Sequence, residues 1–260
     1  MTRLALVTGA SSGIGAETAR ALAGRGFRVI LVARNEDRLS AIAASIGPAA
    51  TVEPCDAADG SACLAMAERV RNSQGIPDVI INSAGVGQWK RIEDTTPAEA
   101  VAMISAPYLA AFNVTHAFMR DMLQRRSGTL IHVNSPACFF AWPAALGYTA
   151  SRCALRGLHE SLCQDLHDTG VRSCHVVFGK VDSEYFEHNP GVEAHMPSIA
   201  RSIRTLAPAE CGRILADVAE RPRRQGVYPF MLRFYYWSYL VAPWLSRWLM
   251  RVTGARRGDA

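Results

Sequence analysis

The chain has 260 residues, of which 49% are hydrophobic and 20% are charged, and its net charge is +5. This composition is that of a globular protein long enough to bury a large core, and it excludes a disordered or fibrous chain. The seven cysteines form no C-x-x-C pair, so we expect reduced core thiols in a cytoplasmic protein and no metal site.

Short apolar runs typical of buried parallel strands alternate with helical patterns along the chain. The expected strands are Leu4–Thr8, Arg28–Ala33, Ala50–Cys55, Asp78–Asn82, Gly128–Asn134 and Arg172–Phe178. The expected helices are Gly13–Arg25, Glu36–Ile46, Ser61–Asn72, Pro97–Gln124, Gly147–Asp168 and Pro208–Glu220, with residues 179–207 as a loop that carries short helices. The alternation predicts an α/β fold, a Rossmann-type doubly wound parallel sheet in a single domain, with its ligand beyond the carboxyl ends of the strands.

A glycine-rich loop joins the first expected strand to the first helix. Glycines permit a tight turn and the close approach of a pyrophosphate, whose charge then lies on the N–H groups at the start of the helix. We therefore interpret the loop as a dinucleotide-binding site, with a purely structural turn as the alternative. The residues expected to contact the cofactor are Gly9, Ser11, Ser12, Gly13, Ile14 and Gly15.

With Thr8 in front of it, this loop has the pattern TGxxxGIG, and the chain resembles the short-chain dehydrogenase/reductase family over roughly residues 3–183. The resemblance implies a nicotinamide cofactor and oxidoreductase activity. Arg34 follows the second strand, where NAD-preferring relatives carry an acidic residue. Because a guanidinium can clamp a 2′-phosphate, NADP(H) is the expected cofactor; the alternative is an exposed loop arginine without a ligand.

Three further motifs of the family complete the expected cofactor site. Asp56 matches the acidic residue that contacts adenine after the third strand. Residues 82–85 match the motif NNAG with one asparagine changed to serine, and residues 178–183 match PGxVxT with phenylalanine in place of proline. From these two segments the resemblance implies contacts with the cofactor by Asn82, Ala84, Gly85, Gly179, Val181 and Ser183.

The expected catalytic residues lie on the fifth strand and the helix that follows it. Ser135 and Tyr148 are thirteen residues apart, the spacing of the serine and tyrosine that act in the family. The resemblance implies that Ser135 holds the substrate carbonyl. Tyr148 then donates a proton to its oxygen as hydride arrives, or removes one in the reverse direction.

Two positions of the expected catalytic site depart from the family pattern. The motif YxxxK is YxxxR here, so that Arg152 shares a helix face with Tyr148. A cation at this position stabilises tyrosinate and can bind the nicotinamide ribose, but arginine relays protons poorly because it stays protonated. Pro107 stands where the family has an active-site asparagine, so we expect the helix to keep an irregularity there and to lose a polar side chain.

The C-terminal part of the chain is basic and aromatic. Residues 201–260 hold eleven arginines against four acidic residues, and three of the five tryptophans lie between residues 237 and 248. We divide the chain into an NADP-binding catalytic region, 1–225, and a segment, 226–260, that is part of the same domain or a separate tail. Residues 230–252 are too interrupted to span a bilayer. They suit a membrane interface, a cover over the substrate cleft, or a subunit contact, and the surrounding apolar residues disfavour nucleic acid.

The sequence favours an NADP(H)-dependent oxidoreductase that reduces a hydrophobic ketone or aldehyde, or oxidises the alcohol. Phe139, Phe140 and Trp142 follow Ser135 and predict an apolar cleft. C-terminal tails similar to this one occur in family members that act on lipids, retinoids and steroids, so the resemblance implies a substrate of that kind. The alternative is a catalytically impaired NADP-binding protein that serves as a sensor or lipid-binding partner. The resemblance further implies a homodimer or homotetramer built through the two longest helices. We expect a cytoplasmic protein that is either free or peripheral on the inner face of the membrane.

Overall fold

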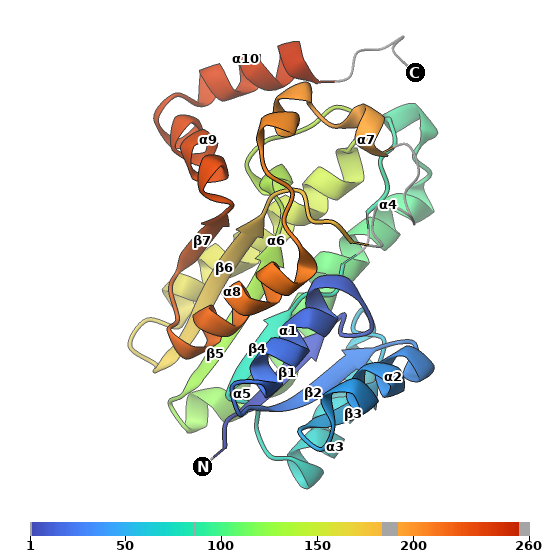
Figure 1. Cartoon of the computed structure of the whole chain (residues 1–260), viewed down its shortest axis with the longest axis vertical. Helices are drawn as coiled ribbons and strands as arrows, with labels where there is room; N and C mark the ends of the chain where they lie inside the picture. Colours follow the sequence, from blue (N-terminus) through green and yellow to red (C-terminus); the bar gives the residue numbers. More distant parts are fainter. Residues whose placement is uncertain (1, 86, 184–191, 255–260) are drawn as a thin grey trace.

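The structure is a computed structural model that describes residues 2–85, 87–183 and 192–254 (Figure 1). Seven parallel strands form a single sheet in the order β3-β2-β1-β4-β5-β6-β7. Their bounds are β1 Leu4–Thr8, β2 Arg28–Ala33, β3 Ala50–Pro54, β4 Val79–Asn82, β5 Gly128–Asn134, β6 Val171–Phe178 and β7 Gln225–Tyr228. The strand order reverses between β1 and β4, which is where a doubly wound sheet binds its ligand.

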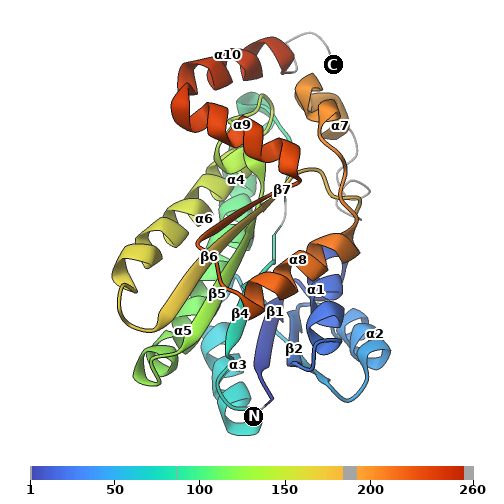
Figure 2. The ribbon, with the colours of Figure 1, turned by 60° about the vertical axis from the view of Figure 1, so that its left-hand side comes forward.

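Helices cover both faces of the sheet, which is why its strands are apolar runs rather than alternating patterns. Helices α1, α2 and α8 pack on one face, and α3, α5 and α6 on the other (Figures 1 and 2). The bounds are α1 Gly13–Ala23, α2 Glu36–Ile46, α3 Gly60–Ser73, α4 Pro97–Ile104, α5 Ala110–Gln124, α6 Leu146–Asp165, α7 Val192–His195, α8 Pro208–Glu220, α9 Phe230–Val241 and α10 Pro243–Thr253. The predicted single-domain Rossmann-type fold is confirmed.

The six predicted strands are confirmed to within one residue at each end, but the sequence analysis missed β7. This strand has only four residues, and its second residue, Gly226, interrupts the apolar pattern. It pairs with β6 at the edge of the sheet, where Gln225 lies opposite His175. The division of the chain between residues 225 and 226 therefore falls inside a strand of the main sheet.

The helix predicted at Pro97–Gln124 is present but is divided by a π-helical turn, Ser105–Leu109. Pro107 lies in this turn and has no N–H to donate to the carbonyl four residues earlier, so the wider turn accommodates the missing bond. The expected irregularity is confirmed. This segment is long and apolar enough to cross a membrane, but Val114, Phe118 and Met122 bury it in the core beneath the sheet.

The C-terminal segment forms two helices, α9 and α10, that stand beyond the carboxyl ends of the strands (Figures 1 and 2). They meet at Ala242, next to Pro243, which begins α10. The sequence analysis recognised the composition of this segment without predicting its helices. At α6 the predicted end was too late: the helix stops at Asp165, because the chain turns through Asp168, whose φ angle is +59°.

Candidate active site

The glycine-rich turn between β1 and α1 brings three segments of the chain into close contact. A Cβ atom on Gly15 would lie 2.2 Å from the carbonyl oxygen of Gly9, and one on Gly9 would lie 3.0 Å from the backbone of Ala84. Gly9 also has a φ angle of +66°, which side-chain-bearing residues rarely adopt. Glycine is therefore required at both positions for the start of α1 to point along the carboxyl ends of the strands.

Thr8 fastens the end of β1 to the loop after β4. Its hydroxyl oxygen accepts hydrogen bonds from the N–H groups of Ser83 (3.0 Å) and Ala84 (3.1 Å). Asn82 is buried one residue earlier, where its amide donates to the Thr115 hydroxyl at 3.2 Å. The structure thus places Asn82 below the loop that Ala84 and Gly85 form, in contact with α5.

A cavity of about 1160 Å³ runs along the carboxyl ends of the strands. This exceeds the ~300–1,000 Å³ usual for one small ligand, so it has room for a dinucleotide and a second molecule. All predicted catalytic and cofactor-binding residues except Asn82 line it. These are Gly9, Ser11, Ser12, Gly13, Ile14, Gly15, Arg34, Asp56, Ala84, Gly85, Ser135, Tyr148, Arg152, Gly179, Val181 and Ser183.

Two arginines line the end of the cavity near β2. Arg34 is exposed just beyond the strand, and Arg38 follows it in the first turn of α2. Asn35 caps this helix by accepting a hydrogen bond from the Arg38 N–H at 2.9 Å. Arg38 was not predicted as a cofactor contact, although it lies only four residues after Arg34. Asp56 lines the same end and accepts a hydrogen bond from the Ala58 N–H at 3.0 Å.

Ser135 and Tyr148 face the other end of the cavity from β5 and α6. Asn134 connects these two elements: its side-chain oxygen accepts from the Ser135 N–H at 2.8 Å, and its side-chain nitrogen donates to the Arg152 carbonyl at 3.0 Å. The Ser135 hydroxyl accepts a long bond of 3.4 Å from the Ala137 N–H. The backbone around Ser135 is therefore held to the helix that carries Tyr148.

Arg152 lies over the ring of Tyr148, with its guanidinium carbon 4.9 Å from the ring centre. One terminal nitrogen donates to the Val133 carbonyl at 3.4 Å, and the other would lie 2.9 Å from a Cβ on Gly85. Its Nε atom is buried and has no hydrogen-bond partner among the described residues. A buried donor without a partner is costly, so it favours a ligand that supplies an acceptor.

These features fit a nicotinamide dinucleotide. The glycine turn leaves the start of α1 open, because its N-cap residue, Ser12, makes no side-chain capping bond. Helix N–H groups there can bind a pyrophosphate. Arg152, at the opposite end, offers an unpaired N–H to a ribose hydroxyl.

Pro107 is buried and does not line the cavity, whose wall beside the π-helical turn is formed by Ser105, Ala106 and Ala110. The Ser105 hydroxyl is already used, since it donates to the Val101 carbonyl at 2.9 Å. The π-helical turn therefore offers few available polar groups to the catalytic end of the cavity.

Aromatic side chains form the wall around Tyr148. Trp89 stacks on the Tyr148 ring with 5.7 Å between ring centres, and the ring centre of Trp142 lies 5.1 Å from that of Trp89. Phe140 also lines the cavity, as predicted, whereas Phe139 packs outward on Tyr236. Trp89 was missed because it lies in the loop after β4 and belongs to no motif.

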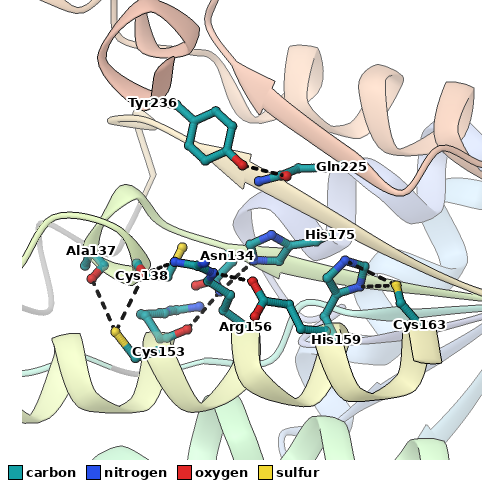
Figure 3. Close-up of polar contacts among 12 residues, drawn as sticks. Asn134, Ala137, Cys138, Cys153, Arg156, His159, Cys163, His175, Gln225 and Tyr236 are labelled. Atoms are coloured by element: carbon teal, nitrogen blue, oxygen red, sulfur yellow. Dashed lines mark hydrogen bonds and ion pairs between the residues drawn. The ribbon is translucent and has the colours of Figure 1, made fainter. Parts of the chain in front are cut away.

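Buried histidines lie behind the catalytic end, in the layer between β6 and α6 (Figure 3). His175 Nε2 is 2.9 Å from the Asn134 side-chain nitrogen, and His159 stacks on His175 and contacts the Ser173 hydroxyl at 2.8 Å. Burial lowers the pKa of His175 well below its usual value and that of His159 to about 4. His175 is therefore neutral and accepts the hydrogen bond from Asn134, which fixes the orientation of that amide.

Comparisons with known proteins identify the family of this chain. The family model described as short chain dehydrogenase matches residues 3–191. An uncharacterized oxidoreductase of Mycobacterium tuberculosis is 31% identical over 242 residues, covering 89% of this chain and 90% of that protein. A metagenomic short-chain oxidoreductase crystallised with NADP superimposes with a TM-score of 0.75 at 29% identity, over 87% of this chain and 96% of that one. An alcohol dehydrogenase from the archaeon Thermococcus sibiricus, complexed with 5-hydroxy-NADP, gives 0.76 at 26% identity, over 88% and 95%.

Proposed function

The chain belongs to the short chain dehydrogenase family and is an oxidoreductase by that membership; on this premise we propose that it uses NADP(H) to reduce a hydrophobic ketone or aldehyde, or to oxidise the corresponding alcohol. The observation that carries the proposal is that Ser135, Tyr148 and Arg152 line the same cavity as the glycine turn.

The preference for NADP(H) rests on Arg34 and Arg38. Both line the cavity just beyond β2, the place where this fold holds the adenine ribose. Two guanidinium groups can pair with a 2′-phosphate, whereas a free ribose hydroxyl would gain little from either. The complexes of two structural relatives with NADP and 5-hydroxy-NADP agree with this choice.

The bound nicotinamide supplies or takes up the hydride. Ser135 donates a hydrogen bond to the substrate carbonyl oxygen and so polarises the carbonyl. Tyr148 donates its phenolic proton to the same oxygen, and in the reverse direction the ionised phenol removes the proton from the alcohol. The Arg152 cation over the Tyr148 ring stabilises the phenolate that remains, and its unpaired N–H holds the ribose.

The expected substrate is apolar because much of the lining of the cavity that holds Tyr148 is apolar. Beside Trp89 and Trp142, the lining includes Met196, Ile199, Ile203, Leu232, Leu249 and Met250. Such a wall binds rings and chains by burial of apolar surface, while Ser135 and Tyr148 select the carbonyl or hydroxyl group.

We also propose that copies of the chain associate through α5 and α6, on which Phe112, Leu123 and Leu146 are exposed.

The test is a panel of apolar ketones and aldehydes of increasing chain length, with NADPH consumption followed by absorbance. We expect turnover by the wild type and a loss of at least about a hundredfold for Tyr148→Phe, within the range of general acid catalysis. Tyr108→Phe is the matched control, because Tyr108 lies outside the cavity lining. Tight NADPH binding without turnover of any compound would instead support a cofactor-binding sensor.

A further inference from the structure

The two C-terminal helices carry a concentration of exposed apolar side chains. In the described chain, ten of the sixteen exposed large apolar residues lie on α9 and α10. Phe230, Phe234, Trp237 and Val241 recur at helical spacing along one face of α9, with Phe234 70% and Trp237 64% exposed. The pattern continues on α10 from Trp244, which is 68% exposed. Solvent exposure of so many aromatic side chains marks an interaction surface.

Positive charge accompanies this surface. Residues 221–254 contain six arginines and no acidic residue. Arg247 and Arg251 are exposed one turn apart on α10, beside Trp244 and Trp248, and within the described residues neither pairs with a carboxylate. A second copy docked symmetrically on this face would set its arginines against identical arginines. An anionic surface complements the face instead.

The opposite side of the same helices belongs to the active-site cavity. Leu232, Tyr235 and Ser238 of α9 line it, as do Ser246, Leu249 and Met250 of α10. The Tyr235 hydroxyl also lies 3.0 Å from that of Ser202, which joins α9 to the segment after α7 that forms the adjoining wall. One helix pair thus has an apolar, cationic outer face and an inner face on the substrate end of the cavity.

We propose that the outer face of α9 and α10, centred on Phe234, Trp237, Trp244 and Trp248, docks on an anionic phospholipid bilayer, and that the cavity behind it takes its substrate from that bilayer. The helices have 12 and 11 residues, too few to span a bilayer, so they lie in the interfacial plane. Tryptophan side chains enter the headgroup boundary while Arg247 and Arg251 pair with lipid phosphates. The identity of the substrate rests on the proposed function, but the docking does not.

The docking is tested by co-flotation of the full chain with vesicles of phosphatidylcholine alone and of phosphatidylcholine with phosphatidylglycerol at low salt. We expect binding to the anionic vesicles and at least tenfold weaker partitioning for Trp237→Ser/Trp244→Ser. A matched control is Leu64→Ser/Val101→Ser, which removes two other exposed large apolar side chains, from α3 and α4. Circular dichroism of all three proteins verifies that each variant is folded, independently of the proposed function.

Three outcomes would overturn the docking. The wild type could stay in the soluble fraction with both vesicles, or the tryptophan variant could float as well as the wild type. Alternatively, the wild type could ignore vesicles and form an oligomer that the tryptophan variant loses, which would make the face a subunit contact.

Substrate delivery has its own readout. With a long-chain ketone dissolved in the anionic vesicles, the tryptophan variant should lose at least tenfold in kcat/KM, while a short soluble ketone should be reduced at the wild-type rate. Delivery from the bilayer is contradicted if the tryptophan variant loses kcat/KM equally for both ketones, or if it loses kcat/KM for neither. If no ketone is reduced by any protein, the proposed function fails while the flotation result stands.

Discussion

Arg152 and Pro107 are the two residues near Tyr148 at which the sequence differs from the expected family pattern, and they lie differently in the structure. Arg152 keeps the cation beside the Tyr148 ring, because its guanidinium lies over the ring and against Gly85. Pro107 keeps the irregular helix as a π-helical turn but adds no polar group to the cavity. We expect Arg152 to keep an electrostatic effect on Tyr148, whereas residue 107 supplies no side chain to a proton path between the catalytic end and solvent.

Substitutions at these residues should therefore be non-additive. Arg152→Lys alone should leave kcat within about tenfold of the wild type, because lysine has no polar partner near Pro107. The change in kcat caused by Pro107→Asn combined with Arg152→Lys should exceed the sum of the changes caused by the two single substitutions, as expected for residues that act as one unit. Steady-state kinetics of the three variants measure this; strict additivity would refute the shared role.

Removing the positive charge of Arg152 should lower activity more than replacing it with lysine. Arg152→Met should lower kcat/KM by more than about tenfold and move the rate profile to higher pH, because ionised Tyr148 loses the charge that stabilises it. The profile is to be measured between about pH 6 and pH 10. Full activity with an unchanged profile would show that Arg152 does not act on Tyr148.

Cofactor preference is tested at Arg34 and Arg38. We expect NADPH to bind about ten- to a hundredfold more tightly than NADH, the range of a charge-assisted hydrogen bond. Arg34→Asp should shrink or reverse this difference, and Arg38→Ala should reduce it in part, since both side chains line the same end of the cavity. Equal binding of the two cofactors by the wild type, measured by calorimetry, would contradict the assignment.

At the scale of elements, the turn between β1 and α1 offers the most restrictive geometry. A Cβ on Gly15 would meet the Gly9 carbonyl, and a methyl group there would displace the start of α1 from the cavity. Gly15→Ala should lose NADPH binding at least tenfold and lower the thermal midpoint. Gly24→Ala is a matched control at the other end of the same helix, where the nearest atom is 3.4 Å away. Equal NADPH affinity in both variants would contradict the role of the turn.

An element can be predicted from the sequence when its own residues encode it, and is missed when it depends on contacts with distant parts of the chain. Strands such as β1 are readable because burial on both faces makes them continuous apolar runs. The glycine turn, Ser135 and Tyr148 follow motifs at fixed spacing. In contrast, β7 has four residues and is defined by pairing with β6, which no local pattern encodes. Trp89 reaches Tyr148 through a loop, and His175 reaches Asn134 through neighbouring strands, so only the folded chain brings them together.

On the scale of the whole molecule, the buried histidines make stability depend on pH. Burial lowers the pKa of His132 to about 3 and that of His159 to about 4. Arg224 and Arg156 lower the pKa of His159 further, against the opposing effect of Glu160. The unfolded chain takes up protons below its ordinary histidine pKa of about 6.5 while these folded-state groups stay neutral. Their contribution is thus complete above about pH 6.5 and is lost as pH falls toward the folded-state values.

The free energy of unfolding should accordingly fall by about 1.4 kcal/mol per pH unit for each such histidine, between about pH 6 and pH 4. Urea titrations across this interval measure the slope. His159→Asn should reduce this slope by one histidine's share, because the lowered pKa of that buried side chain is then removed. A wild-type slope of zero would show that these histidines are protonated in the folded protein.

We propose that this cavity transfers hydride between NADPH and an apolar carbonyl with Tyr148 as the proton donor. The most direct measurement uses NADPH with both hydrogens at C4 of the nicotinamide replaced by deuterium and a ketone that the panel shows to be consumed, with the alcohol analysed by mass spectrometry. The account predicts one deuterium on the carbinol carbon with the wild type and with Tyr108→Phe, and almost no product with Tyr148→Phe. Deuterated alcohol formed equally fast by Tyr148→Phe, or NADPH that binds without ever labelling a product, would contradict it.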